Sequence, residues 1–406
     1  MKIRPFRQSL SLRAVKYAYL SRILFQLERR LPFSSFTRRV RAARLEVGAS
    51  SFVLRNRYRV GHGNADSEER FVVCADINDL YSGLGCCLLL LGPCWKFALK
   101  TGRTLVIDWR GNPYTRADPS RNLFAVLFEP PDPSEIGVSC IGDDSVNDLR
   151  LPQPILGPAE TFPQESGEVH RFPGAGLDAR SMRRILASGL DVDFPTVLPS
   201  LSTLFGLARD LGPMGSQRPT MFTFKEGQRL YKSLKLRPSW AASVSEFHRA
   251  HLADGPVVGV HVRHGNGEGT SRGHFRGREI DGVSAFLGSL AEKIRRYATG
   301  RFGRRFTVFL CTDSDDVVDF LKPRFDSLVS RRIWRPPPGA GIDFDHAYRR
   351  ADGGVQAAVD ALVDMRLLAT CDAVLLARPT EFASHVPYLM EKPGAVFLGH
   401  EQTAAL

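Results

Sequence analysis

Short apolar runs alternate with helical stretches along this 406-residue chain, and that alternation constrains the fold more than any other feature. In the second half, strands are predicted at Val257–Val262, Phe306–Cys311, Arg332–Trp334, Ala373–Leu376 and Ala395–Leu398. Helices are expected among them, at 239–253, Ala285–Ala298, from Asp315, Gly353–Thr370 and Glu381–Met390. Strands that alternate with helices form parallel sheets, because each helix is the crossover between two strands.

The first half opens with the same kind of unit. Strands are predicted at Arg70–Ala75 and Thr104–Asp108, joined by a helix over Cys86–Lys100 that Gly102 closes. A further strand is expected at Val138–Ile141, whereas residues 150–235 hold many Pro and Gly and show no clear period. The length suits two domains. We therefore expect an α/β protein with two Rossmann-like domains facing a cleft, an N-terminal one over 70–235 and a C-terminal one over 236–406.

The positive charge lies mainly in the first 50 residues. Of a formal net charge of +12, residues 1–50 carry twelve Lys and Arg against two acids, a net +10 that leaves +2 for the rest. Residues 51–406, which carry little net charge, are therefore not expected to bind nucleic acid. Apolar residues recur at spacings of three and four from Leu12 to Leu31, which predicts a basic amphipathic helix in this extension. Residues 1–47 would contact an anionic membrane surface, or the helix would dock on its own domain.

The segment His261–Glu268 (HVRHGNGE) follows an apolar predicted strand directly. A basic, glycine-containing loop after a strand is typical of the carboxyl edge of an α/β sheet, where ligands bind. The guanidinium of Arg263 can bind a diphosphate through two hydrogen bonds, and His261 leaves the strand on the same face. Gly265 and Gly267 allow backbone N–H groups to approach an anion. The alternative for Arg263 is an ordinary surface ion pair.

Two further strand ends carry polar residues. Thr312, Asp313 and Ser314 follow one predicted strand and open the next helix, so either Ser314 caps that helix or the three residues face the ligand. Thr380 stands between a strand and a helix. It caps this helix, or it helps the helix N-terminus to hold a phosphate.

Asp364 lies within the apolar helical stretch Ala361–Met365 and needs partners there, because burying a bare charge costs several kcal/mol. One interpretation is that Asp364 binds a guanine base, since guanine offers N1–H and N2–H to a carboxylate in one bidentate contact. The alternatives are a solvent-facing side chain or a pair with Arg366.

No metal and no cofactor are expected. The acidic pairs at 191–193 and 343–345 follow no clear strand, and Gly83-Leu84-Gly85 lacks the third glycine of a dinucleotide fingerprint. No uninterrupted apolar run of transmembrane length is present. The seven cysteines form no C-x-x-C pair, so they are expected to be buried free thiols in a reducing cytoplasm.

Six segments, taken in order, resemble the family of NodZ-like nodulation fucosyltransferases and eukaryotic core α-1,6-fucosyltransferases. The resemblance extends from about residue 70 to 390 and leaves out the basic extension. It is carried by Gly83–Gly85 with Trp95–Ala98, Thr101–Arg110, Asn122–Pro130, His261–Glu268, Cys311–Ser314 and Leu362–Cys371.

This resemblance implies a GT-B-like fold and an inverting, metal-independent glycosyltransferase that uses GDP-fucose. The implied acceptor is the 6-hydroxyl of a reducing-end N-acetylglucosamine on a chito-oligosaccharide of Nod-factor type. Arg263 would bind the diphosphate and neutralise it as it leaves, and His261 would contact the nucleoside. Asp364 would read the guanine, and the remaining donor contacts would come from Thr312, Asp313, Ser314 and Thr380.

The resemblance assigns catalysis to Arg263, Glu268 and His264, with Glu268 the nearest candidate for the general base. The sequence departs from the family here. Gly269 stands where NodZ-like chains have Asp, and the Lys and catalytic Glu of the eukaryotic relatives fall on Gly267 and Ser271. These departures bear on two assignments: which residue is the general base, and which glycan is the acceptor.

Two alternatives remain open: a related GDP-sugar transferase acting on a surface polysaccharide, and a nucleotide-sugar binding protein without catalysis. The expected partners are a GDP-sugar and a glycan acceptor. The expected location is the cytoplasm, peripheral on the inner membrane face if the extension binds lipid.

Overall fold

The computed structural model describes residues 59–60, 69–75, 84–110, 112–115, 117–118, 120–151, 155–156, 196–197, 223–263, 280–335, 354–377, 380–391 and 395–397. The predicted basic helix of residues 1–50 and the acidic pairs at 191–193 and 343–345 lie outside these residues.

A first sheet of five parallel strands forms from the N-terminal half. Its order is β4-β3-β2-β7-β6. These strands are β2 (Phe71–Ala75), β3 (Thr104–Asp108), β4 (Cys140–Ile141), β6 (Ile155–Leu156) and β7 (Thr196–Val197). All five residues of β2 are buried, as expected for a parallel strand covered on both faces. The crossover to β3 is α3 (Leu84–Thr101), which ends before Gly102 at a positive φ of 67°.

Shorter elements complete this half. They are the parallel pair β1 (Arg59–Val60) and β5 (Arg150–Leu151), helices α4 (Leu123–Leu127), α5 (Pro133–Ile136) and α8 (Phe224–Ser233), and the 3₁₀ turns η2 (Pro113–Thr115) and η3 (Asp144–Asn147).

A second sheet of five parallel strands forms from the C-terminal half, in the order β10-β9-β8-β11-β12. Its strands are β8 (Val257–Val262), β9 (Thr307–Thr312), β10 (Leu328–Val329), β11 (Ala373–Leu376) and β12 (Ala395–Phe397). Numbered along the chain, this is the 3-2-1-4-5 order of a Rossmann-like sheet.

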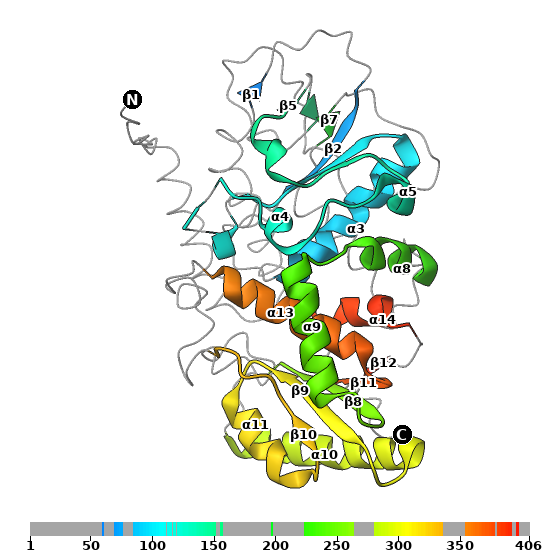
Figure 1. Cartoon of the computed structure of the whole chain (residues 1–406), viewed down its shortest axis with the longest axis vertical. Coiled ribbons are helices and arrows are strands. Elements are labelled where there is room, and N and C mark those ends of the chain that lie inside the picture. The colour runs from blue at the N-terminus through cyan, green and yellow to red at the C-terminus, as the bar shows by residue number, and fades with distance from the viewer. Residues whose placement is uncertain are drawn as a thin grey trace, which may run out of the picture.

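Helices cover both faces of the second sheet (Figure 1). On one face, Val258, Val260 and Val262 of β8 pack in a hydrophobic cluster with α10 (Ile280–Phe302) and α11 (Asp315–Leu321), which the turn η4 (Lys322–Arg324) follows. The other face meets α13 (Val355–Thr370), and α9 (Pro238–His251) packs on α13. A Cβ on Gly259 would come within 2.9 Å of Cys371 Sγ, so glycine permits the close approach of β8 to the end of α13.

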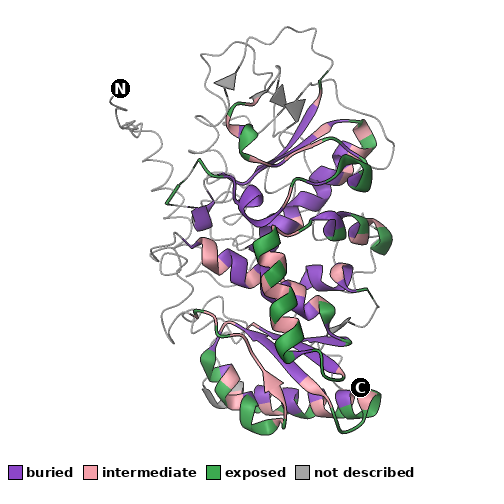
Figure 2. Ribbon diagram, in the orientation of Figure 1, coloured by how far each residue is buried: buried purple, intermediate pink, exposed green. Residues whose placement is uncertain are grey.

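The two sheets share a hydrophobic core. One cluster of buried residues extends from β2 and α3, through α13, to Phe309 and Leu376 of the second sheet. Helix α13, the 3₁₀ turn η5 (Ala383–His385) and α14 (Val386–Leu389) belong to the C-terminal half of the sequence, yet they contact α3, α4 and α8. Figure 2 shows buried residues concentrated in α3 and in the central strands of the two sheets, β2 and β3 in the first and β8, β9 and β11 in the second.

Most predicted elements are confirmed, and two need correction. No strand forms at Arg332–Trp334; the neighbouring strand β10 lies at Leu328–Val329. The helix predicted at Glu381–Met390 is a turn followed by η5 and α14, since Pro387 has no N–H to donate to a preceding carbonyl. The predicted division at residues 235 and 236 stays a prediction.

Helix α3 is the one helix, among the described residues, with the length and hydropathy to cross a membrane. Within the fold 72% of it is buried, and Trp95 and Phe97 are fully enclosed. It therefore packs as the central helix of the first half.

Candidate functional site

The order of the second sheet reverses between β8 and β11. From β8 the chain continues to β9 and β10 on one side, and β11 and β12 lie on the other. Ligands of open α/β sheets bind beyond the carboxyl ends of the strands at such a reversal. His261 pairs in register with Leu376 of β11, so Arg263 and Ala377, which follow these strands, lie at the same edge of the sheet.

Arg263 lies at this reversal, directly after β8. Val262 pairs in register with Thr312 of β9, which places Arg263 beside Asp313, and the two side chains form an ion pair. Their exposed fractions are 29% for Arg263 and 18% for Asp313. An arginine that is partly exposed at this edge can still reach a diphosphate. Arg263 thus forms an ion pair, and the pair lies at the edge where open α/β sheets generally bind ligands.

His261 is the penultimate residue of β8, and its buried side chain lies on the face of the sheet that meets α13. Its ring stacks on Phe382, with ring centroids 4.9 Å apart and an interplanar angle of 23°. Its carbonyl accepts a hydrogen bond of 3.1 Å from the N–H of Ala377, directly after β11. The contact with Phe382 could not be predicted from the sequence, because the two residues lie far apart in the chain and meet only through tertiary packing.

Helix α3 of the first half approaches the same turn. Gly85 lies so close that a Cβ there would be 2.5 Å from the backbone N of Phe382. The carbonyl of Gly85 accepts a hydrogen bond of 2.8 Å from Nε2 of His385. The ring of His385 also meets Tyr231 edge-on at 4.8 Å. Both halves of the chain thus contact the turn on which His261 stacks.

Replacing Gly85 with alanine should test this contact. A methyl group would collide with backbone rather than with a movable side chain, so we expect a loss of about 1–3 kcal/mol in the free energy of unfolding. Gly288→Ala is the matched control, since that helical position has open space, and it should stabilise by about 0.5–1 kcal/mol. Equal stability of the two variants in urea titrations would contradict the prediction.

Asp364 is buried on α13 and bonded to an arginine. Its Oδ1 accepts a hydrogen bond of 2.9 Å from Arg331, which also donates to Asp360 Oδ1 at 3.0 Å. The alternative pairing with Arg366 is wrong, because Arg366 instead donates to the carbonyl of Leu234. Burial raises the pKa of Asp364 to about 6, although Arg331 favours the ionised form.

The segment after β10 is also fixed to the end of β9. Arg335 donates from Nε to the carbonyl of Thr312 at 3.0 Å and pairs with Asp315 at 2.8 Å. It also donates to the hydroxyl of Ser330. Neither Arg331 nor Arg335 is predicted as a site residue from the sequence, because the two residues flank a segment, Arg332–Trp334, that was expected to be a strand.

Two buried groups should give opposite responses of stability to acid. Burial lowers the pKa of His385 to about 4, so the unfolded chain binds more protons between pH 6.5 and 4 and stability falls as pH falls. The raised pKa of Asp364, about 6 against 3.8, does the reverse between pH 6 and 4. Each contribution is about 3 kcal/mol and they largely cancel.

Single substitutions should separate these contributions. Relative to the native chain, Asp364→Asn should lose about 3 kcal/mol of stability on going from pH 6.5 to 4, and His385→Gln should gain about as much. Urea titrations across this range measure both. Parallel pH curves for the native chain and the two variants would rule out these assignments.

The other predicted residues divide into those described and those not. Thr312 Oγ1 accepts from the N–H of Ser314 at 3.3 Å, and Ser314 begins α11 without a capping bond from its side chain. Thr380 Oγ1 accepts from the N–H of Ala383 at 3.0 Å, in the turn before η5, whereas the N-cap of η5 itself is Phe382, which makes no capping bond from its side chain. His264 and Glu268 lie outside the described residues, as do Arg378 and Pro379.

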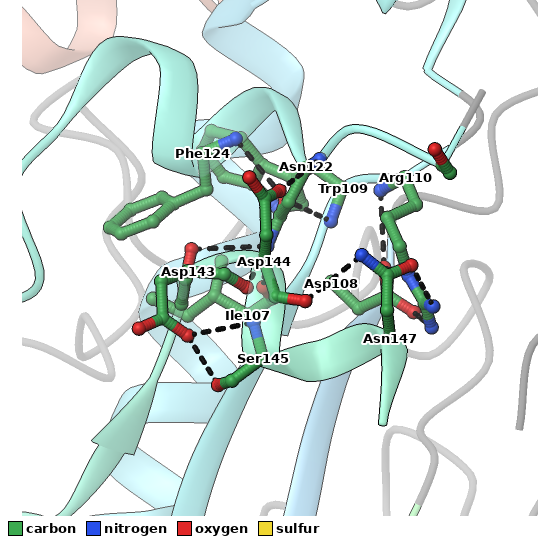
Figure 3. Close-up of polar contacts among 12 residues, drawn as sticks. Ile107, Asp108, Trp109, Arg110, Asn122, Phe124, Asp143, Asp144, Ser145 and Asn147 are labelled. Atoms are coloured by element: carbon green, nitrogen blue, oxygen red, sulfur yellow. Dashed lines mark hydrogen bonds and ion pairs between the residues drawn. The ribbon is translucent and has the colours of Figure 1, made fainter. Parts of the chain in front are cut away.

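A second polar cluster lies at the carboxyl end of β3 in the first sheet (Figure 3). Asp108 and Arg110 form a bidentate ion pair, with Nε–Oδ1 at 2.8 Å and Nη2–Oδ2 at 2.9 Å. Asn122 connects the neighbouring loops by donating to the carbonyls of Ile107 and Gly142. The adjacent turn η2 packs on α13. This cluster fixes the end of β3 just before η2.

Two Rossmann-like parallel sheets, with basic and acidic side chains gathered at the strand-order reversal of the second, define a GT-B-like α/β protein. The chain belongs to the Nodulation protein Z (NodZ) family, which matches residues 68–198 and 221–397.

Individual relatives agree with this assignment. Nodulation protein Z of Bradyrhizobium diazoefficiens is 28% identical over 359 residues, covering 84% of this chain and 87% of that protein. Nodulation protein Z of Sinorhizobium fredii is also 28% identical, covering 74% and 85%. The crystal structure of fucosyltransferase NodZ from Bradyrhizobium is similar, with a TM-score of 0.57, 26% identity, and coverage of 80% and 94%. A structure of NodZ alpha-1,6-fucosyltransferase soaked with GDP-fucose gives a TM-score of 0.56, 26% identity, and coverage of 80% and 93%.

Proposed function

We propose that this protein is an inverting glycosyltransferase that moves fucose from GDP-fucose to a glycan. The observation that carries the proposal is the position of Arg263, at the strand-order reversal of a Rossmann-like sheet, in a chain of the NodZ family. A relative of this family has been studied with GDP-fucose, and the coverage of both chains is high.

Arg263 supplies the electrostatic part of the reaction. As the glycosidic bond breaks, positive charge grows on the sugar ring and negative charge on the departing GDP. A guanidinium beside the diphosphate stabilises this second charge more in the transition state than in the bound donor, which accelerates the reaction. Asp313 forms an ion pair with this guanidinium and holds it at the end of β8.

Recognition of the nucleoside falls to residues of α13, β8 and the turn after β11. Asp364 accepts N1–H and N2–H of guanine, and His261 with Phe382 provides an aromatic surface beside it. Thr312, Ser314 and Thr380 line the same edge of the sheet, where Thr380 begins the turn after β11.

The acceptor oxygen needs a base to remove its proton. Glu268 is proposed for this role, with His264 as its neighbour in the loop after β8. The acceptor is proposed to be the 6-hydroxyl of a reducing-end N-acetylglucosamine on a chito-oligosaccharide. The reaction is proposed to need no metal, because Arg263 takes the place of a cation at the diphosphate.

Transfer to chitotetraose, measured with EDTA present, tests the proposal. We expect GDP release together with a fucosylated product, and no effect of EDTA. A panel of GDP-sugars separates this donor from others. Transfer from a different GDP-sugar would favour a related transferase, and GDP binding without any transfer would favour a binding protein.

The basic extension is proposed to hold the enzyme at the inner membrane face, in the cytoplasm. Residues 1–50 carry twelve Lys and Arg, and each such residue near an anionic surface contributes about 1 kcal/mol. Deletion of residues 1–47 should therefore lower partition onto anionic liposomes by at least 10-fold, with partition onto neutral liposomes as the control. Unchanged partition would contradict this role.

A further inference from the structure

Arg331 is the only described side chain that bonds both carboxylates on one face of α13. Asp360 and Asp364 are four residues apart, so they lie one above the other on the helix. Arg331 Nη1 donates to Asp364 Oδ1 at 2.9 Å and to the carbonyl of Asp360 at 2.9 Å, while Nη2 donates to Asp360 Oδ1 at 3.0 Å. The three side chains are 15% exposed or less.

This arrangement leaves acceptor capacity on Asp364. A carboxylate has about four lone-pair positions, and Arg331 fills one of those on Oδ1. Two carboxylates and one guanidinium carry a net charge of −1, which suits the donor edge of a guanine. Arg331 restricts the orientation of the Asp364 carboxylate, because the guanidinium bonded to Oδ1 is itself held at two points of Asp360.

The same segment is tied to the diphosphate end of the site. Arg335, four residues further on, donates to the carbonyl of Thr312 and to the carbonyl of Arg331 at 3.0 Å. Thr312 is the last residue of β9 and precedes Asp313, the partner of Arg263. One short segment thus links the base-reading end of the site to the diphosphate-binding end.

We propose that Arg331 is a positioning residue for guanine recognition, which holds the Asp364 carboxylate in the orientation that accepts N1–H and N2–H. This inference rests on the proposed function, in which Asp364 reads the base. Arg331 does not touch the reacting atoms. Arg331 affects specificity for the base through Asp364, whereas Arg263 stabilises the diphosphate during bond cleavage.

Affinities for GDP and ADP, measured by calorimetry on the full chain, test this role. Arg331→Met should weaken GDP binding by about 10- to 100-fold, because an Asp364 carboxylate that is no longer held in place loses its charge-assisted hydrogen bonds to guanine, and should leave ADP binding nearly unchanged. The preference for GDP over ADP should fall by the same factor. With saturating GDP-fucose, kcat should stay within about threefold of the native value.

Two further variants make the outcome decisive. Arg332→Met removes the same charge from the exposed neighbouring residue and should retain the native preference. Arg331→Lys keeps the charge but lacks the planar fork that bonds two carboxylates, so its preference should lie between those of the native chain and Arg331→Met. It also provides the test if the methionine variant does not fold.

Native base preference in a folded Arg331→Met chain, or in Arg331→Lys, would overturn the inference. Equal affinity of the native chain for GDP and ADP would overturn it too, because no guanine would then be read. The proposed function fails in a distinguishable way: without fucosyl transfer, a GDP preference that depends on Arg331 would still support the role of this residue in base recognition.

Discussion

Arg263→Ala is expected to lower kcat by about 100- to 1000-fold, with a smaller change in the affinity for the donor. Removing one preorganised group that stabilises developing negative charge typically has an effect of this size. The loss should fall mainly on kcat because the charge on GDP grows as the bond to fucose breaks. Initial rates of transfer from GDP-fucose to chitotetraose measure both parameters.

Two substitutions in the Arg263–Asp313 ion pair, at the ends of β8 and β9, serve as controls for Arg263→Ala. Arg263→Lys keeps a positive charge without the two-armed contact, so its kcat should fall between the native and alanine values. Asp313→Asn keeps an oxygen that accepts from Arg263, and should lower kcat by less than about 10-fold. Near-native turnover of Arg263→Ala would show that another group neutralises the diphosphate.

The strand-end geometry around Arg263 could be predicted from the sequence. The apolar run Val257–Val262 has the length of a buried strand, and side chains alternate along a strand, so His261 and Arg263 had to share one face. Strand β9 could be placed in the same way, to within one residue. Local patterns are sufficient where the chemistry lies on consecutive residues of one regular element.

The partners of Asp364 and His261 could not be predicted. Arg331 lies 33 residues before Asp364 in the chain, and their meeting depends on how β10 and α13 pack. The partner considered from the sequence was Arg366, two residues from Asp364, but residues at this spacing face different sides of a helix. Phe382 and His385 lie in irregular turns, and their contacts with His261 and Gly85 join segments that are far apart in sequence.

The largest expected effect on stability concerns the ion pair at the end of β3. Asp108 is 0% exposed and Arg110 is 5% exposed. The guanidinium bonds both carboxylate oxygens and also donates to Asn147 Oδ1 at 2.9 Å. Arg110→Met would leave the carboxylate buried without its counter-charge. We therefore expect a loss of about 3–5 kcal/mol in the free energy of unfolding, measured by urea titration.

A second substitution should recover part of this loss. In Asp108→Asn/Arg110→Met the buried charge is gone, while the amide oxygen can still accept the backbone N–H of residue 110, a bond of 3.1 Å in the native chain. The double variant should therefore be more stable than Arg110→Met alone, because most of the single-variant cost is the uncompensated charge rather than the lost attraction. A double variant at least as unstable as Arg110→Met would instead show that the guanidinium stabilises this loop chiefly through its bond to Asn147 and its packing.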